Sequence, residues 1–248
     1  MRYWLTPPVR DADFDAKVAD VCTLYREAAT LAAQGERILS TDELTGVTPW
    51  GYPALERAHP RLPMRPGDVE RQEFEYLRHG TCAFILNRNV VTGEVVAPSC
   101  GPTRTEADFV APIAQTVAGD PLVTRWHFVV DNLNIHQSEG LVRWVAAQDA
   151  PAAELGEKGK RGVLASMASR AAFLSDPCHR VVFHYTPVHS SWLNQIELWF
   201  SILTRKLLKR GSFGSVETLC AAVLAFIAVY NRTAKPFKWT YQGKPLVG

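Results

Sequence analysis

Two aspartates in this chain stand at the ends of predicted strands, and the strand that ends at the second is the most hydrophobic of the chain. Asp42 follows residues 37–41, and Asp131 follows residues 126–130. In open α/β sheets, ligands bind beyond the carboxyl ends of the strands. A buried carboxylate there is costly unless a cation compensates its charge, and hard oxygen ligands select Mg²⁺ or Mn²⁺. The pattern therefore favours a metal site, although an Asp in this position can also simply cap backbone amides at the start of a loop.

A third acid, Glu197, lies in a predicted helix over residues 191–209. Apolar residues recur at helical spacing along it and define its buried face: Leu193, Ile196, Phe200, Leu203 and Leu207. Glu197 lies at the edge of that face, so its side chain is expected to point toward the protein. Asn194, one turn earlier, is expected to orient it. The alternative is that Glu197 pairs with Arg205 or His189.

Three inward-facing carboxylates have the chemistry to hold two Mg²⁺ ions, with Mn²⁺ as a substitute. Such ions lie about 3.5–4 Å apart and stabilise the attacking and leaving oxygens of an in-line phosphoryl transfer. That reaction needs positioned charge more than a covalent nucleophile. The sequence has no G-x-S-x-G elbow and no phosphate-binding P-loop. Asp42, Asp131 and Glu197 are thus the predicted catalytic and metal-binding residues.

The elements that must position these acids alternate between strands and helices. Strands are predicted over 37–43, 80–86, 90–97, 126–131 and 180–185, with a turn at 87–89 and an irregular stretch over 44–78. Helices are predicted over 12–34, 105–118, 138–148, 163–175, 191–209 and 215–231, the last capped by Ser215. This order predicts an α/β fold with a mixed central sheet flanked by helices, the order of the RNase H-like fold.

We divide the chain into three segments: an N-terminal helical segment or linker over 1–35, a catalytic domain over 36–232 with an insertion at about 150–176, and a basic tail over 233–248. The start of the chain lacks the apolar core of a signal peptide, and no apolar run approaches the length of a membrane span. A cytoplasmic protein is therefore expected. Five scattered cysteines without a C-x-x-C pair argue against a disulfide framework or a cysteine-rich zinc site.

The formal net charge of +2 does not by itself indicate a nucleic-acid partner. The distribution of basic residues is more informative, because several lie in clusters. The candidate DNA contacts are Lys158, Lys160 and Arg161 in the insertion, and Arg205, Lys206, Lys209 and Arg210 at the end of the predicted helix 191–209. The alternative for each cluster is an ordinary solvated surface.

Three motifs resemble those of mariner-type DDE transposases, most closely the branch of bacterial insertion sequences. They are S-T-D-E at 40–43, V-V-D-N-L-N-I-H at 129–136, and T-P-V-H-S-S-W-L-N-Q-I-E-L-W-F at 186–200. The last is the most specific, and the resemblance extends from about Trp4 to Trp239. It implies an RNase H-like domain in which Asp42, Asp131 and Glu197 bind the metal ions. It also implies cutting at the ends of a mobile element and joining into target DNA, typically at TA, by a homodimer in the bacterial cytoplasm at the nucleoid.

Residues next to the triad are expected to support it. Asn132 and His136 match the family block beside Asp131, where they would orient that aspartate or contact DNA. His136 as an ordinary residue at the entry to a helix is the alternative. Glu43 is the rival of Asp42, because alternation along the strand decides which of the two faces the site.

The sequence departs from the family pattern in three places. The interval from Asp131 to Glu197 is longer than usual, which the insertion at 150–176 explains, and an unusual stretch at 48–53 follows the first acid. The helix-turn-helix region that reads terminal repeats is expected before this chain begins, so we expect weak, non-specific DNA binding. The alternatives to a transposase are an RNase H-like nuclease without strand transfer and an inactive remnant that binds DNA or dimerises.

Overall fold

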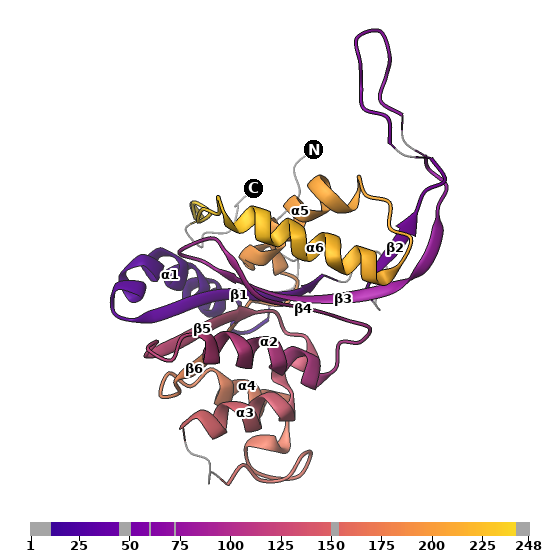
Figure 1. The fold of residues 1–248 in the computed structure, drawn as a ribbon. Helices are drawn as coiled ribbons and strands as arrows, with labels where there is room; N and C mark the ends of the chain where they lie inside the picture. The colour runs from indigo at the N-terminus through magenta and orange to yellow at the C-terminus, as the bar shows by residue number, and fades with distance from the viewer. Residues whose placement is uncertain (1–10, 45–50, 60, 72, 150–153, 242–248) are drawn as a thin grey trace.

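A mixed six-stranded sheet forms the centre of the computed structural model, which describes residues 11–44, 51–59, 61–71, 73–149 and 154–241 (Figure 1). The strands are β1 (Glu36–Leu44), β2 (Tyr52–Glu56), β3 (Leu77–Asn89), β4 (Val95–Gly101), β5 (Arg125–Val130) and β6 (Val181–Tyr185). β1 pairs antiparallel with β3 and parallel with β5, and β5 pairs parallel with β6. β2 and β4 both pair antiparallel with β3.

Helices cover both faces of this sheet, which confirms the predicted α/β class (Figure 1). They are α1 (Phe14–Ala33), α2 (Glu106–Gly119), α3 (Glu139–Asp149), α4 (Met167–Leu174), α5 (Gln195–Leu203) and α6 (Val216–Asn231). α2, α3 and α4 lie on one face, and α1, α5 and α6 lie on the other. Alternation along β1 separates the two cores: Leu39 packs with α2 and α3, whereas Ile38 packs with α1.

The helix predictions are largely confirmed. Ser215 caps α6 through a hydrogen bond from the Thr218 amide. The predicted helix over 163–175 is α4, which follows a short 3-10 turn, η2 (Val163–Ala165). Two further 3-10 turns, η1 (Asn134–Gln137) and η3 (Ser191–Leu193), precede α3 and α5. Residues 150–153 of the predicted insertion lie outside the described residues.

The prediction that β1 ends in its two acids is wrong. β1 continues through Leu44, because its antiparallel ladder with β3 extends to the pair Leu44–Phe84. The parallel ladder with β5, in contrast, stops at Ser40. Asp42 therefore lies inside a strand but beyond the last pair that this strand makes with β5. Asp131 follows β5 directly, as predicted.

The predicted turn at 87–89 is also misplaced, because polar residues there are buried inside β3. The Asn87 side chain accepts a hydrogen bond from the Thr41 hydroxyl at 2.8 Å and donates one to Thr116 at 3.2 Å. Arg88 is buried and donates to Gln195 at 2.9 Å. The turn falls instead at 90–94, where Gly93 adopts φ +82 and lies so close to the Lys235 carbonyl that a Cβ would clash.

The predicted helix over 191–209 contains a wide turn that the apolar pattern did not reveal. α5 ends at Leu203 and continues as a π-helical segment, η4 (Thr204–Leu208), in which the Lys209 amide donates to the Thr204 carbonyl. The wide turn accommodates one extra residue. Leu208 is consequently the buried residue after Leu203, whereas the predicted Leu207 is half-buried.

The segment predicted to be irregular, 44–78, contains regular structure at its ends. β2 lies within it, and β3 begins at Leu77. Between them the chain forms an arm that projects away from the body of the molecule (Figure 1). Residues 45–50, which include the first half of the unusual stretch at 48–53, lie outside the described residues. None of the described helices is both long and apolar enough to span a membrane.

Three of the cysteines lie closer together than their scattered positions in the sequence suggest. Cys100 and Cys220 form a disulfide that joins β4 to α6, with a Cα–Cα distance of 6.4 Å. Cys82 of β3 lies beside it, with its Sγ 3.3 Å from that of Cys100 and 3.1 Å from that of Cys220. Sequence spacing could not reveal this cluster, because the sheet and α6 bring together residues that are far apart along the chain.

Candidate active site

Three acids from three distant segments meet at one edge of the sheet. Asp42 comes from β1, Asp131 follows β5, and Glu197 lies in the first turn of α5. One ligand atom each of Asp42, Asp131 and His136 lies within 4.8 Å of the others. Glu197 is not one of these three, but it lines the same cleft as Glu43 of β1. The structure thus groups Asp42 with Asp131, whereas Glu197 as the third metal ligand stays a prediction.

A hydrogen-bonded link between β1 and α5 fixes Asp42 relative to Glu197. The Asn194 amide donates to the Thr41 carbonyl at 3.0 Å and to the Asp42 carboxylate at 3.2 Å. Ser40 donates to the Asn194 side chain and accepts a 2.7 Å bond from the Ile196 amide. Ser40 and Asp42 point to the same face of β1, toward α5, because they are two residues apart.

Asn194 therefore acts differently from the prediction. Its buried side chain holds Asp42, and the structure gives no side-chain contact from it to Glu197. Asn132 also differs, because its amide donates to the Thr186 carbonyl at 2.6 Å and thereby ties the end of β5 to the end of β6. It supports the loop that carries Asp131 instead of orienting that carboxylate.

His136, in η1, bridges two acids and fulfils its predicted supporting role. Its Nδ1 lies 2.8 Å from the Asp131 carboxylate, and its Nε2 lies 2.9 Å from that of Glu43. The side chain is fully buried, which opposes its charge, but the neighbouring carboxylate of Glu43 and the bond to Asp131 outweigh burial and raise the pKa of His136 to about 10. His136 is thus an imidazolium that orients Asp131 and hydrogen-bonds to Glu43.

The electrostatics of the three acids suit a divalent cation. Burial and the charge of Asp131 raise the pKa of Asp42 well above its usual range, and the same two causes raise the pKa of Glu197. Burial also acts on Asp131, but the bond from His136 and the Leu133 amide outweigh it and lower the pKa of Asp131. Oxygen donors that repel one another in a buried site fit Mg²⁺ or Mn²⁺, which relieve that repulsion.

A cleft of about 600 Å³ opens beside this group. Its lining combines acids with bases: Glu43, Glu197, Arg205 and Lys209 all contribute, together with apolar and hydroxyl side chains of α5. Two of the predicted DNA contacts therefore lie next to the acids. Lys206 and Arg210 are exposed but do not line the cleft.

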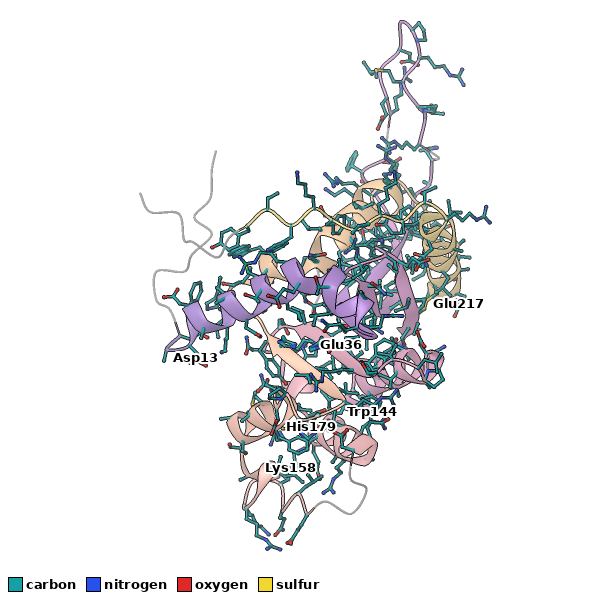
Figure 2. The ribbon with its side chains drawn as sticks, turned by 90° about the vertical axis from the view of Figure 1, so that its left-hand side faces the viewer. Asp13, Glu36, Trp144, Lys158, His179 and Glu217 are labelled. Atoms are coloured by element: carbon teal, nitrogen blue, oxygen red, sulfur yellow. A yellow bond between two sulfur atoms is a disulfide. The ribbon has the colours of Figure 1, made fainter. Side chains whose placement is uncertain are left out.

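The basic cluster of the insertion has different surroundings. Lys158 lies at the end of the molecule away from the projecting arm (Figure 2) and pairs with Glu106 at 3.5 Å. Lys160 pairs with Glu157 at 2.5 Å, and Arg161 pairs with Glu154 at 3.8 Å. Each of these cations already has an acidic partner, so the cleft residues are better placed to meet phosphate.

Sequence reasoning missed two supporting residues. Ser40 stands two positions before Asp42, and strand alternation alone could have placed it on the same face. Tyr185, whose hydroxyl donates to the His136 carbonyl at 2.8 Å, gives no comparable signal, because an aromatic residue in a strand is ordinarily core.

Solved transposase structures share this fold. The Mos1 mariner paired-end complex with Mn aligns with a TM-score of 0.50 at 10% identity, covering 92% of this chain and 58% of that chain. The Mos1 transposase paired-end complex with left transposon end aligns with a TM-score of 0.50 at 12% identity and the same coverage. These matches confirm the predicted RNase H-like fold. The chain spans 58% of the length of these Mos1 chains.

The amino-acid sequence matches the model of a known protein family. The family described as DDE superfamily endonuclease matches residues 53–220, which is more than half of the chain. The chain therefore belongs to the DDE endonuclease superfamily. The matched segment contains Asp131 and Glu197, whereas Asp42 precedes it. A search of curated proteins found no match.

Proposed function

We propose that this chain is the catalytic domain of a DNA transposase that cuts DNA at the ends of a mobile element and joins those ends to a target. The observation that supports the proposal is the grouping of Asp42 of β1 with Asp131 after β5, with Glu197 of α5 lining the adjacent cleft. These three residues are the proposed catalytic set, and membership of the DDE endonuclease superfamily agrees with it.

Asp42, Asp131 and Glu197 are the residues that would hold Mg²⁺, or Mn²⁺ in its place, as two ions. When bound, such ions supply Lewis-acid stabilisation for the attacking and leaving oxygens of a phosphoryl transfer. The protein contributes orientation. Asn194 fixes the carboxylate of Asp42, and His136 fixes that of Asp131. Positioned in this way, the acids need little reorganisation as charge develops on the phosphate.

Basic side chains would bring the DNA backbone to these acids. Arg205 and Lys209 line the same cleft as Glu197, which supports their assignment as phosphate contacts. Lys206, Arg210, Lys158, Lys160 and Arg161 remain predicted contacts further away. The finer assignments are part of this proposal: a bacterial insertion-sequence element, a TA target, a homodimer, and action at the nucleoid in the cytoplasm.

The test uses two reactions of the full chain in Mg²⁺ or Mn²⁺. The first is nicking of a supercoiled plasmid, and the second is joining of a labelled duplex with a free 3′-hydroxyl to that plasmid. A transposase domain gives both products, and EDTA abolishes both. Nicking without joining would replace the proposal with an RNase H-like nuclease. The absence of both products would leave an inactive remnant.

A further inference from the structure

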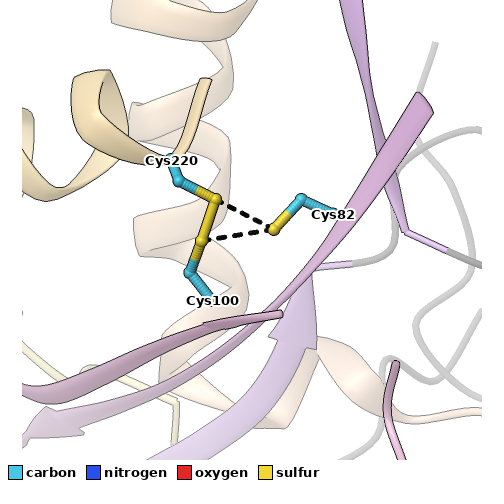
Figure 3. Close-up of side chains that lie close together, drawn as sticks. All are labelled: Cys82, Cys100 and Cys220. Carbon is cyan, nitrogen blue, oxygen red and sulfur yellow. Dashed lines mark hydrogen bonds between the residues drawn. A yellow bond between two sulfur atoms is a disulfide. The ribbon is translucent and has the colours of Figure 1, made fainter. Parts of the chain in front are cut away.

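The cluster of Cys82, Cys100 and Cys220 lies away from the acids and has no part in the function proposed above. The three sulfurs come from β3, β4 and α6, and all lie within 4.8 Å of one another (Figure 3). Cys82 is fully buried, and the other two are half-buried at the edge of the core beneath α6. Among the described residues, no histidine or carboxylate joins this cluster.

We infer that these three cysteines form a site for a thiophilic metal ion such as Zn²⁺, which is open when Cys100 and Cys220 are reduced and closed when they form their disulfide. A tetrahedral site with Zn–S distances of about 2.3 Å separates its sulfurs by roughly 3.8 Å. Cys82 already lies 3.3 and 3.1 Å from the other two sulfurs. These two distances need to lengthen by only a few tenths of an ångström, whereas the disulfide pair has to separate fully, which reduction allows.

The proposed site forms in two steps, reduction of the disulfide and then binding of the metal ion. A small thiol reductant gives two electrons and two protons to the Cys100–Cys220 bond, which becomes two thiols while the reductant becomes a disulfide. Three sulfur–metal bonds then form as the thiols release their protons, and water takes the fourth position. Reducing compartments keep such cysteines as thiols.

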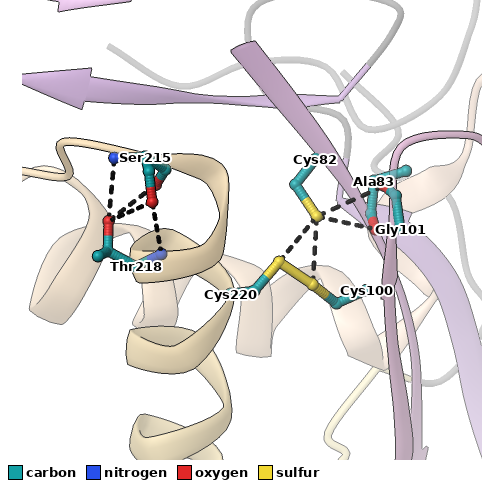
Figure 4. The surroundings of a disulfide bond; sticks show 7 residues. All are labelled: Cys82, Ala83, Cys100, Gly101, Ser215, Thr218 and Cys220. Atoms are coloured by element: carbon teal, nitrogen blue, oxygen red, sulfur yellow. Dashed lines mark hydrogen bonds between the residues drawn. A yellow bond between two sulfur atoms is a disulfide. The ribbon is translucent and has the colours of Figure 1, made fainter. Parts of the chain in front are cut away.

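The surroundings of Cys82 favour metal binding over exchange with the neighbouring disulfide. Its thiol makes 3.5 Å contacts with the carbonyls of Ala83 and Gly101 (Figure 4). Burial raises the pKa of Cys82 to about 11, so at neutral pH it is a thiol and a poor nucleophile. A metal ion can still bind the Cys82 sulfur at neutral pH, because coordination itself displaces the thiol proton.

The experiment titrates the full chain with Co²⁺, which gives a thiolate-to-metal charge-transfer band in the near ultraviolet that carboxylate ligands do not give. The reduced chain should bind one equivalent with this band, and Zn²⁺ should displace it. The oxidised chain should show no band. Cys82→Ser should lower the affinity for Co²⁺ by more than about tenfold. Loss of a residue that only hydrogen-bonds to a metal ligand already costs about that much, and Cys82 would be a ligand itself. Cys22→Ser, which removes a buried cysteine of α1, is the matched control and should change nothing.

Two results would overturn the site: a reduced wild-type chain without the band, or a Cys82→Ser variant that keeps it at full affinity. If a serine variant fails to fold, the comparison of oxidised and reduced wild-type protein still decides, because an equal thiolate charge-transfer band in both forms excludes a site that the disulfide closes.

Discussion

Adjacent acids in β1 have different surroundings, and these define their different roles. Asp42 points toward α5 and is held by Asn194, whereas Glu43 is bound to the imidazolium of His136. We expect Asp42→Asn to lower the rate of metal-dependent nicking by about 10²–10³-fold, because it removes charge that stabilises the transition state. Glu43→Gln should cost only about tenfold, as an outer partner does.

Single-turnover nicking rates of the two variants provide the measurement. Both variants should bind DNA as the wild type does, since neither changes the basic residues. If Glu43→Gln proves the more damaging of the two, the assignment of the first catalytic acid is wrong and Glu43 takes its place.

Glu197→Gln should separate catalysis from folding. We expect it to abolish nicking while leaving the Tm of the metal-free protein unchanged or higher, because burial and Asp131 already disfavour the charge of Glu197 in the folded state. Glu27→Gln, which neutralises an exposed acid of α1, is the control and should retain full activity. Nicking at the wild-type rate by Glu197→Gln would contradict the proposed triad.

For single residues, spacing and residue type were enough to propose the three acids but not all of the residues that hydrogen-bond to them. Asp42, Asp131 and Glu197 follow from apolar patterns in their own segments. The bonds from Asn194 to Asp42 and from His136 to Glu43 join residues more than 90 positions apart. No local pattern encodes such partners, because they depend on how β1, η1 and α5 pack.

Among the elements, α5 and η4 carry both an acid and bases into one cleft. Arg205→Ala and Lys209→Ala should each weaken DNA binding and reduce the slope of log K against log salt by about one unit. Lys160→Ala should change this slope less, because Lys160 pairs with Glu157. Fluorescence anisotropy across a salt series measures the slopes. An equal effect of all three substitutions would mean that the cleft has no special role in binding.

A chain of hydrogen bonds on the α1 side of the sheet should make stability depend on pH. His127 of β5 contacts Glu36 at 2.6 Å and His184 at 2.9 Å, and His184 contacts Asp20 of α1 at 2.7 Å. Burial lowers the pKa of His127, with a smaller contribution from His184 and Arg125, although Glu36 acts in the opposite direction. The unfolded state therefore binds more protons as the pH falls below about 6.5.

The contribution of His127 to the free energy of unfolding in urea should accordingly fall between pH 7 and pH 5. A His127→Gln variant, which cannot take up that proton, should lose less over the same range even if it is less stable at pH 7. Parallel pH profiles of the two proteins would show that His127 is not responsible.

Periodicity predicted most elements because their burial follows helical or strand repeats. It failed where side chains inside an element are polar. Asn87 and Arg88 resemble turn residues in sequence, yet their partners Thr116 and Gln195 satisfy them inside β3. Tertiary hydrogen bonds of this kind override local propensity.

On the scale of the whole molecule, metal binding should stabilise the fold, because the acids repel one another without a cation. At a Mg²⁺ concentration ten times the Kd, linkage contributes about 1.4 kcal/mol. This corresponds to a rise in Tm of about 3–6 °C for a chain of this length. Differential scanning fluorimetry with and without Mg²⁺ measures it. The Asp131→Asn variant should show little rise, and an unchanged wild-type Tm at saturating Mg²⁺ would argue against the metal site.

The fold class could be predicted from the order of elements, since strands and helices alternate along the chain as a mixed, helix-covered sheet requires. The cysteine cluster could not, because Cys82, Cys100 and Cys220 meet only when β3, β4 and α6 pack together. Spacing motifs for cysteines detect metal sites and disulfides whose cysteines lie near one another in the sequence. They do not detect cysteines that the fold brings together from distant segments.

The wide turn at Thr204–Leu208 has a consequence for how the chain tolerates change in length. A π-helical turn is what an α-helix becomes when it gains one residue without moving its flanks. Deletion of a single residue within 204–206 should therefore convert the turn into ordinary α-helix and leave Leu208, renumbered by one, still in the core. The wide turn beside the cleft is therefore consistent with a one-residue insertion into an ordinary α-helix. We expect homologous sequences to include members that are one residue shorter at this point.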